Sequence, residues 1–262
     1  MSARTSITWL AGPAGRPYLL AALALPPFLY LAGQTFGLTV DDAFISWRYA
    51  LNWVAGCGPV YNCGEPAVEG YTNFLWMALS AGAIGAGMDV VQAMHALGLL
   101  CGGAALLALG LLARRVHGGP LAALVPVLVL GCSPFWAVNA VSGLETPAAT
   151  LSVIIAAALS VELPGGRRPW LAGLAWGVSY LLRPEALLFA AITAVWALAR
   201  GLIARRGLGW TLWRVAQLGL GVLLVAGPYF AWRVSYYGEL LPNTLHAKRL
   251  PLGFLLRHNG EL

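Results

Sequence analysis

Residues 71–88, which read YTNFLWMALSAGAIGAGM, decide how the chain is arranged, because they form an apolar run almost long enough to cross a membrane. A spanning helix needs about 20 apolar residues. If this run crosses, every later segment changes sides. The run is rich in Gly, Ala and Ser, a composition that suits packing against other helices. The side on which each later loop lies therefore depends on residues 71–88.

The composition is that of a membrane protein. Of 262 residues, 59% are hydrophobic and 10% are charged, whereas soluble domains are nearly half apolar and about a quarter charged. This excludes a water-soluble enzyme, a disordered protein and a nucleic-acid binder with a basic working face. The net charge of +6 is better explained by topology, because cytoplasmic loops collect Lys and Arg. We expect an all-α, polytopic transmembrane bundle.

The positive-inside rule favours an arrangement in which residues 71–88 do not cross the membrane. Apolar runs of roughly spanning length lie at 18–38, 71–88, 92–113, 119–138, 147–162, 170–183, 186–200 and 213–234. If residues 71–88 do not cross and the N-terminus is inside, ten cations lie inside: Arg4, Arg16, Arg114, Arg115, Arg167, Arg168, Arg200, Arg205, Arg206 and Arg214. Six then lie outside: Arg48, Arg183, Arg233, Lys248, Arg249 and Arg257. If the run crosses, the split becomes seven inside and nine outside, against the rule.

We therefore predict about seven spans, with residues 71–88 at the outer interface. The N-terminus is expected in the cytoplasm, and residues 39–91 form a first outer loop with juxtamembrane helices. The acids then divide unevenly. Glu162 alone falls inside, and nine fall outside: Asp41, Asp42, Glu65, Glu69, Asp89, Glu145, Glu185, Glu239 and Glu261. A shared site on the outer face would explain this bias.

Two outer segments carry the first candidate site residues. DDAFISWRYALNWVAG begins with Asp41 and Asp42, a pair that suits a general base, a metal ligand or both. Taken alone, the pair is better explained as a solvated loop entrance. Cys57 and Cys63 lie in GCGPVYNCGEP and would form a disulfide in an oxidising periplasm, although their spacing does not establish the geometry of a bridge.

Further outer segments have both a structural and a functional interpretation. Glu145, in AVNAVSGLETPAAT, stands where an acid would stabilise a helix N-terminus. Arg183, in LLRPEALL, would reach the interface as a snorkelling side chain or hold a lipid phosphate. Lys248 follows the last apolar run as a further outer cation.

Taken in order, these segments resemble a known family. DDAFISWRYALN, GPVYNCGEPAVEGYTNFLW, SGLETP, LRPEALL and YYGELLPNTLHAK are similar to segments of bacterial GT-C integral-membrane glycosyltransferases. Within that superfamily they resemble the group of the mycobacterial terminal β-(1→2)-arabinofuranosyltransferase. The resemblance runs from about Leu38 to Lys248. It implies a polyprenyl-phosphate-linked sugar donor and an envelope glycan, lipid or protein acceptor. It also implies an active site at the periplasmic face of the bacterial inner membrane, among membrane lipids and without nucleic acid.

The resemblance assigns roles to residues of this chain. It places catalysis on Asp41 or Asp42, and we expect Arg183 and Lys248 to stabilise the leaving phosphate. A divalent metal, Mg²⁺ or Mn²⁺, held by Asp41 and Asp42 is the alternative. Substrate binding is expected from Arg48, Glu69, Tyr71, Asn73, Glu145, Glu185 and Asn243.

The resemblance also suggests how the chain is divided. Residues 1–250 are expected to form the GT-C-like core, and 251–262 to begin a truncated or absent C-terminal part. A lipid or solute transporter and a non-catalytic scaffold are the competing interpretations.

Overall fold

The computed structural model describes residues 22–117, 120–161 and 168–240, and the regular structure in these ranges is helical. In chain order the helices are α3 (Leu25–Thr35), α4 (Asp41–Val54), α5 (Phe74–Gly85), α6 (Val90–His117), α7 (Pro120–Gly131), α8 (Pro134–Ala140), α9 (Thr146–Val161), α10 (Pro169–Leu182), α11 (Ala186–Ile203) and α12 (Leu208–Tyr237). The all-α helical fold expected from composition is confirmed.

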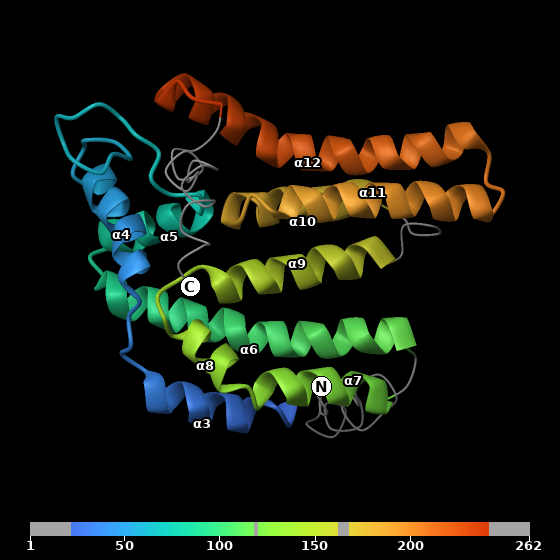
Figure 1. The fold of residues 1–262 in the computed structure, drawn as a ribbon, viewed down its shortest axis with the longest axis horizontal. Helices are drawn as coiled ribbons and strands as arrows, with labels where there is room; N and C mark the ends of the chain where they lie inside the picture. Colours follow the sequence, from blue (N-terminus) through green and yellow to red (C-terminus); the bar gives the residue numbers. More distant parts are fainter. Residues whose placement is uncertain (1–21, 118–119, 162–167, 241–262) are drawn as a thin grey trace, which may run out of the picture.

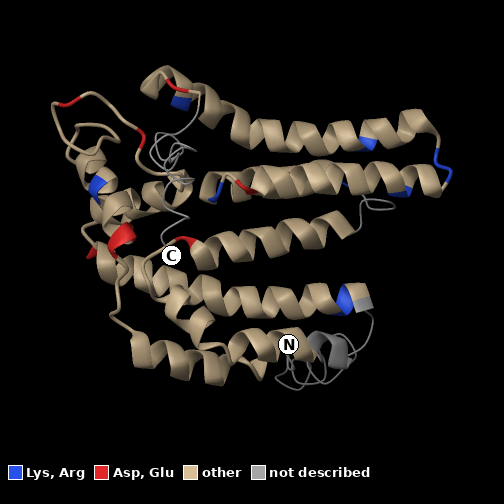
Figure 2. Ribbon diagram, viewed as in Figure 1, with Lys and Arg blue, Asp and Glu red and all other residues tan. Residues whose placement is uncertain are grey.

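The long helices lie side by side, and the short helices α4 and α5 gather at one end of them (Figure 1). Figure 2 shows that the acids in the described ranges also lie at this end, whereas Lys and Arg occur at both ends. These acids are Asp41, Asp42, Glu65, Glu69, Asp89, Glu145, Glu185 and Glu239. We call this the acidic end of the bundle. The expected gathering of carboxylates on one face is therefore present, while Glu162 and Glu261 lie outside the described residues.

The run at 71–88 forms a helix that is too short to cross a membrane. α5 has 12 residues and is therefore about 18 Å long, against a hydrocarbon thickness of about 30 Å. It lies beside α4 at the acidic end (Figure 1). This agrees with the prediction that the run does not span. By length and composition, three described helical segments are able to cross: Val90–Val116, Ala186–Ile203 and Leu208–Tyr237. The count of about seven spans stays a prediction.

The sequence had suggested a single helix over the apolar run at 119–138, and the structure shows that this is wrong. It is divided between α7 and α8. Pro134 lacks the N–H that a continuing helix would need, and the Ser133 hydroxyl accepts a hydrogen bond from the Trp136 backbone N–H at 3.3 Å. Ser133 therefore caps a new helix at the point where α7 stops.

Small residues set the closest helix contacts. α10 and α12 cross at Gly173 and Gly221, where a Cβ on Gly173 would lie 2.9 Å from the Cα of Gly221. Such glycines allow the helix backbones to touch, a common feature of membrane bundles. α11 and α12 also expose large apolar side chains, including Val195 of α11 and Leu223 of α12. Their exposure suits contact with lipid.

The predicted orientation is testable by single-cysteine labelling. In a variant with Cys101 and Cys132 replaced by serine, a cysteine at Glu185 should react with a membrane-impermeant maleimide on intact cells. A cysteine at Arg115 should react only after permeabilisation, because positive residues favour the cytoplasmic side. Labelling at position 115 in intact cells would contradict the predicted orientation.

Candidate functional site

The adjacent carboxylates Asp41 and Asp42 form the first turn of α4 and are exposed. The positive end of the helix dipole stabilises negative charge there. The position of this turn is set by Val40, whose backbone N–H donates to the Ser142 carbonyl at 3.1 Å. Thr39 Oγ1 shares a hydrogen bond of 3.1 Å with His95 Nε2 of α6. The carboxylate pair is thus attached to the turn before α9 and to the start of α6.

The turn before α9 packs tightly against two tryptophans. Trp76 Nε1 donates to the Gly143 carbonyl at 2.9 Å. Gly143 has φ +84°, and a Cβ there would lie 2.9 Å from the Trp47 ring. Glycine is required at this position both by the left-handed backbone and by the close approach of the ring. The result is a rigid connection between α4, α5 and the residues that lead to Glu145.

A chain of polar contacts then joins four segments, and we call it the Glu145 network: Ser46, Asn73, Glu145 and Arg183. Ser46 Oγ donates to Asn73 Oδ1 at 3.1 Å. Asn73 Nδ2 donates to Glu145 Oε2 at 2.8 Å. Glu145 Oε1 and Arg183 Nη2 form an ion pair at 2.6 Å. The structure thereby brings together three residues that the sequence placed in separate segments, namely Asn73, Glu145 and Arg183.

The Glu145 network ends in a cation that faces solvent. The Glu145 side chain is 9% exposed, whereas that of Arg183 is 46% exposed. Arg183 Nη2 also donates to Thr146 Oγ1 at 3.3 Å. A guanidinium has five N–H donors in a fixed plane, so donors remain for an anion that reaches the acidic end. The buried carboxylate and amide hold the guanidinium in place for such a contact.

Glu69 and Arg233 form a second ion pair, which is buried. Their side chains are 3% and 5% exposed, and Arg233 Nε lies 2.8 and 2.7 Å from the two Glu69 oxygens. Arg233 Nη1 donates to the Leu240 carbonyl at 3.0 Å. Burial raises the pKa of the Glu69 carboxyl, and contact with Arg233 offsets part of that rise. The pair fastens the first outer loop to the end of α12.

Tyr71 lies beside this pair and is also enclosed by protein. Its hydroxyl is 3.0 Å from the hydroxyl of Tyr237, which in turn donates to the Pro59 carbonyl at 2.7 Å. Burial strongly raises the pKa of Tyr71 above its ordinary value. Glu69 and Tyr71, both expected to bind substrate, thus have protein partners that hold the outer loop in place.

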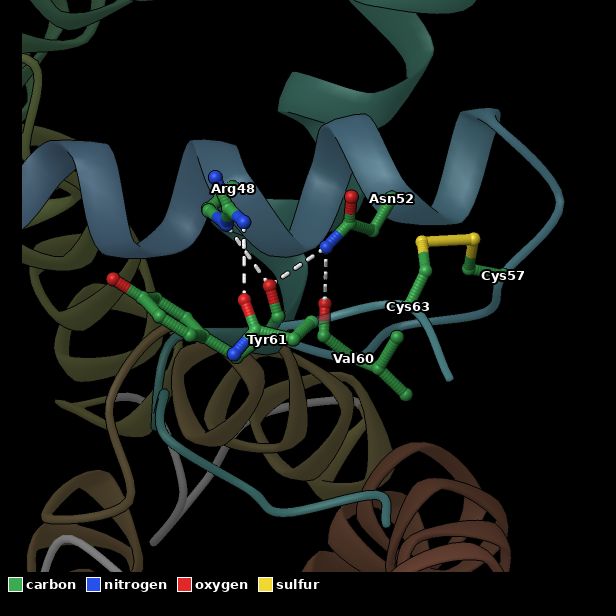
Figure 3. Close-up of a disulfide and its surroundings, with 7 residues drawn as sticks. Arg48, Asn52, Cys57, Val60, Tyr61 and Cys63 are labelled. Atoms are coloured by element: carbon green, nitrogen blue, oxygen red, sulfur yellow. Dashed lines mark hydrogen bonds between the residues drawn. A yellow bond between two sulfur atoms is a disulfide. The ribbon is translucent and has the colours of Figure 1, made fainter. Parts of the chain in front are cut away.

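The outer loop is closed by the disulfide between Cys57 and Cys63, whose Cα atoms are 5.5 Å apart. Figure 3 shows the loop lying against α4. Arg48 Nε donates to the Tyr61 carbonyl at 2.9 Å and Arg48 Nη2 to Asn62 Oδ1 at 3.0 Å. Asn52 Nδ2 donates to the Val60 carbonyl at 2.9 Å. Arg48, a predicted substrate ligand, therefore holds this loop.

Three further residues were predicted to contact donor or substrate, namely Glu185, Asn243 and Lys248. Glu185 is exposed at the start of α11. Asn243 and Lys248 lie outside the described residues. No group of three or more His, Cys, Asp or Glu side chains within the described ranges forms a metal-binding cluster.

Some contacts at the acidic end were not anticipated from the sequence. The pairing of Arg233 with Glu69 joins residues separated by 164 positions, and His95 meets Thr39 across 56 positions. Arg233 had been noted only as an outer cation. No local motif signals either contact, because each depends on the way α6 and α12 pack.

The fold and the site define a helical membrane protein. At one end of its bundle it has exposed carboxylates and an arginine that a buried carboxylate holds in place. The chain is 30% identical over 257 residues to the terminal β-(1→2)-arabinofuranosyltransferase of Corynebacterium glutamicum, covering 87% of this chain and 36% of that protein. It is 36% identical over 228 residues to the Mycobacterium tuberculosis protein of the same name, covering 79% of this chain and 34% of that protein. The chain therefore resembles this group of transferases over most of its own length.

The chain spans about a third of the length of these curated relatives. No protein-family model matches the chain. No solved structure matches it.

Proposed function

We propose that the protein is a membrane glycosyltransferase that moves a sugar from a polyprenyl-phosphate donor to a cell-envelope acceptor at the periplasmic face. The observation that carries this proposal is the link between Asp41 and Arg183 at the acidic end. Val40, next to Asp41, bonds Ser142, and Glu145 in the same turn holds Arg183. The names of the two relatives support a sugar transferase, and the apolar helices suit a lipid-linked donor.

In this proposal, one end of the link supplies the general base and the other end supplies the cation for the leaving phosphate. Asp41 or Asp42 takes the proton of an acceptor hydroxyl, and the resulting oxygen attacks the anomeric carbon. The new glycosidic bond forms while the bond from that carbon to the phosphate oxygen breaks. Polyprenyl phosphate leaves with the bonding electron pair, and inversion at the anomeric carbon follows from a single displacement. Asp41 and Asp42 are exposed in the first turn of α4 and are therefore accessible to an acceptor hydroxyl.

The leaving phosphate needs positive charge in the transition state. Arg183 supplies it in this proposal, with Lys248 as a second cation. The alternative is a divalent ion, Mg²⁺ or Mn²⁺, held by Asp41 and Asp42, because Mg²⁺ commonly binds through one or two carboxylates together with substrate phosphate.

Transfer from a radiolabelled polyprenyl-phosphate sugar tests the proposed function directly. The purified full chain in detergent is given the donor with a neutral arabinofuranosyl oligosaccharide as acceptor. Appearance of label in the oligosaccharide is the expected result. Donor flux across vesicles without transfer would instead indicate a transporter, and neither flux nor turnover would indicate a scaffold; both outcomes contradict the proposal.

Arg183→Lys should weaken binding of a non-hydrolysable polyprenyl-phosphate analogue about tenfold, equivalent to about 1.4 kcal/mol. Lysine cannot reproduce the planar, two-point contact of a guanidinium with phosphate. Affinity is measured beside thermal stability, with Arg168→Lys at the opposite end of the bundle as the matched control. Unchanged affinity in Arg183→Lys would leave Arg183 as an interface anchor and exclude it from phosphate binding.

A further inference from the structure

A cavity of about 340 Å³ lies between α4 and the outer loop, apart from Arg183 and its network. Its lining includes Tyr49, Tyr61, Asn62, Glu65 and Val68. Pockets of a few hundred Å³ that combine apolar walls with a few polar groups are typical small-molecule sites. The volume and the mixed lining point to a ligand with both apolar faces and polar edges.

The lining has the chemistry that recognises a saccharide. Tyr61 lines the cavity and is 47% exposed, and aromatic rings of this kind pack against the C–H face of a sugar. Glu65 and Asn62 are side by side, with Asn62 Nδ2 donating to Glu65 Oε2 at 2.9 Å. A carboxylate has two oxygens with several acceptor positions, so Glu65 keeps acceptors for sugar hydroxyls.

A disulfide and several hydrogen bonds hold the walls of the cavity. On one side, the disulfide between Cys57 and Cys63 closes the loop that carries Tyr61. On the other side, the Tyr49 hydroxyl donates to the Val68 carbonyl at 2.7 Å and accepts from the Gly70 N–H at 2.9 Å. Preorganisation of this kind lowers the entropic cost of binding.

Charge separates this cavity from the donor phosphate. Glu65 lines the cavity and its negative charge would repel a phosphate. Arg48 donates to Tyr61 and Asn62. Arg48 also lies over the Tyr61 ring, 5.4 Å from its centroid, without lining the cavity. The occupant is therefore expected to carry hydroxyl groups and no phosphate.

We propose that this cavity is a subsite for the saccharide part of the acceptor, with Tyr61 as its stacking platform and Glu65 and Asn62 as its polar edge. The inference rests on the proposed function for the identity of the ligand, because it assigns the cavity to the acceptor of that reaction. The lining includes Ile45 and Tyr49 of α4, the helix that begins with Asp41 and Asp42, so an acceptor chain bound here lies at the acidic end of the bundle.

Binding of a synthetic arabinofuranosyl tetrasaccharide, measured by calorimetry on the full chain in detergent without donor, tests the subsite. Tyr61→Ala should lower affinity at least about fivefold, and Glu65→Gln about threefold or more, whereas Tyr61→Phe should retain the affinity because it keeps the ring. Phe135→Ala removes another exposed aromatic ring, outside the cavity, and should leave binding unchanged. The double variant Cys57→Ser, Cys63→Ser should bind more weakly than wild type.

Equal affinities in wild type and Tyr61→Ala, or no binding in wild type, would overturn the subsite. Thermal stability of each variant distinguishes loss of the site from loss of the fold. Because this measurement needs no turnover, it separates the two proposals. Tyr61-dependent binding in a protein that transfers no sugar would contradict the proposed activity and retain the saccharide site.

Discussion

Replacing both Asp41 and Asp42 by asparagine should reduce sugar transfer at least about a hundredfold, the lower range for general base catalysis. Asparagine keeps the size and polarity of each side chain but cannot accept the acceptor's proton. Affinity for the donor analogue should remain within about threefold, because the carboxylate acts on the acceptor hydroxyl. The single variants then show which of the two carboxylates is the base. Initial rates of label transfer, compared with donor-analogue affinity, provide the measurement.

Asp89→Asn is a matched control for these variants. Asp89 is exposed at the start of α6, and its Oδ1 accepts the Gln92 backbone N–H at 2.8 Å. Asparagine caps helices about as well as aspartate, so this variant should retain wild-type turnover and stability. Full activity in the Asp41→Asn, Asp42→Asn double variant would remove both residues from catalysis.

Breaking the buried Glu69–Arg233 pair should cause the largest loss of stability. Glu69→Gln leaves the Arg233 guanidinium buried without an opposite charge, and removing one partner of such a pair costs about 3–5 kcal/mol. Arg233 Nη2 already has no hydrogen-bond partner within the described part of the chain, so little compensation is available. The midpoint of thermal unfolding in detergent should fall clearly. Glu65→Gln, at an exposed acid of the same loop, should change it little.

The double variant Glu69→Met, Arg233→Met distinguishes an uncompensated charge from a general packing defect. With neither charge buried, most of the lost stability should return, because apolar replacements of a buried ion pair are often neutral or stabilising. A double variant as unstable as Glu69→Gln would show that the contribution of the pair lies in its hydrogen bonds to Tyr229 and Leu240. A stable Glu69→Gln single variant would contradict the expected cost.

Several features of the candidate site were accessible from local sequence. Asp41 and Asp42 stand at the start of a polar, aromatic segment, and the acids gather on one side once the cations are assigned to sides. The six-residue separation of Cys57 and Cys63 allowed the disulfide that the structure contains. The structural role of each residue in the folded protein was not predictable from local sequence. Glu69 and Glu145 are both acids next to glycine-containing turns, yet one is buried against α12 and the other holds a half-exposed arginine.

The sequence by itself determined the class of fold, because apolar runs and scarce charges leave helices as the structure that satisfies the backbone in lipid. It also predicted that residues 71–88 do not span the membrane, because charge balance between loops is a sum over the whole chain. Only the tertiary structure decided that Arg233 neutralises Glu69, and that Asn73 and Glu145 hold Arg183. Those contacts join residues that are tens to more than a hundred positions apart in the sequence. They form only when the packed helices bring these residues within hydrogen-bonding distance of one another.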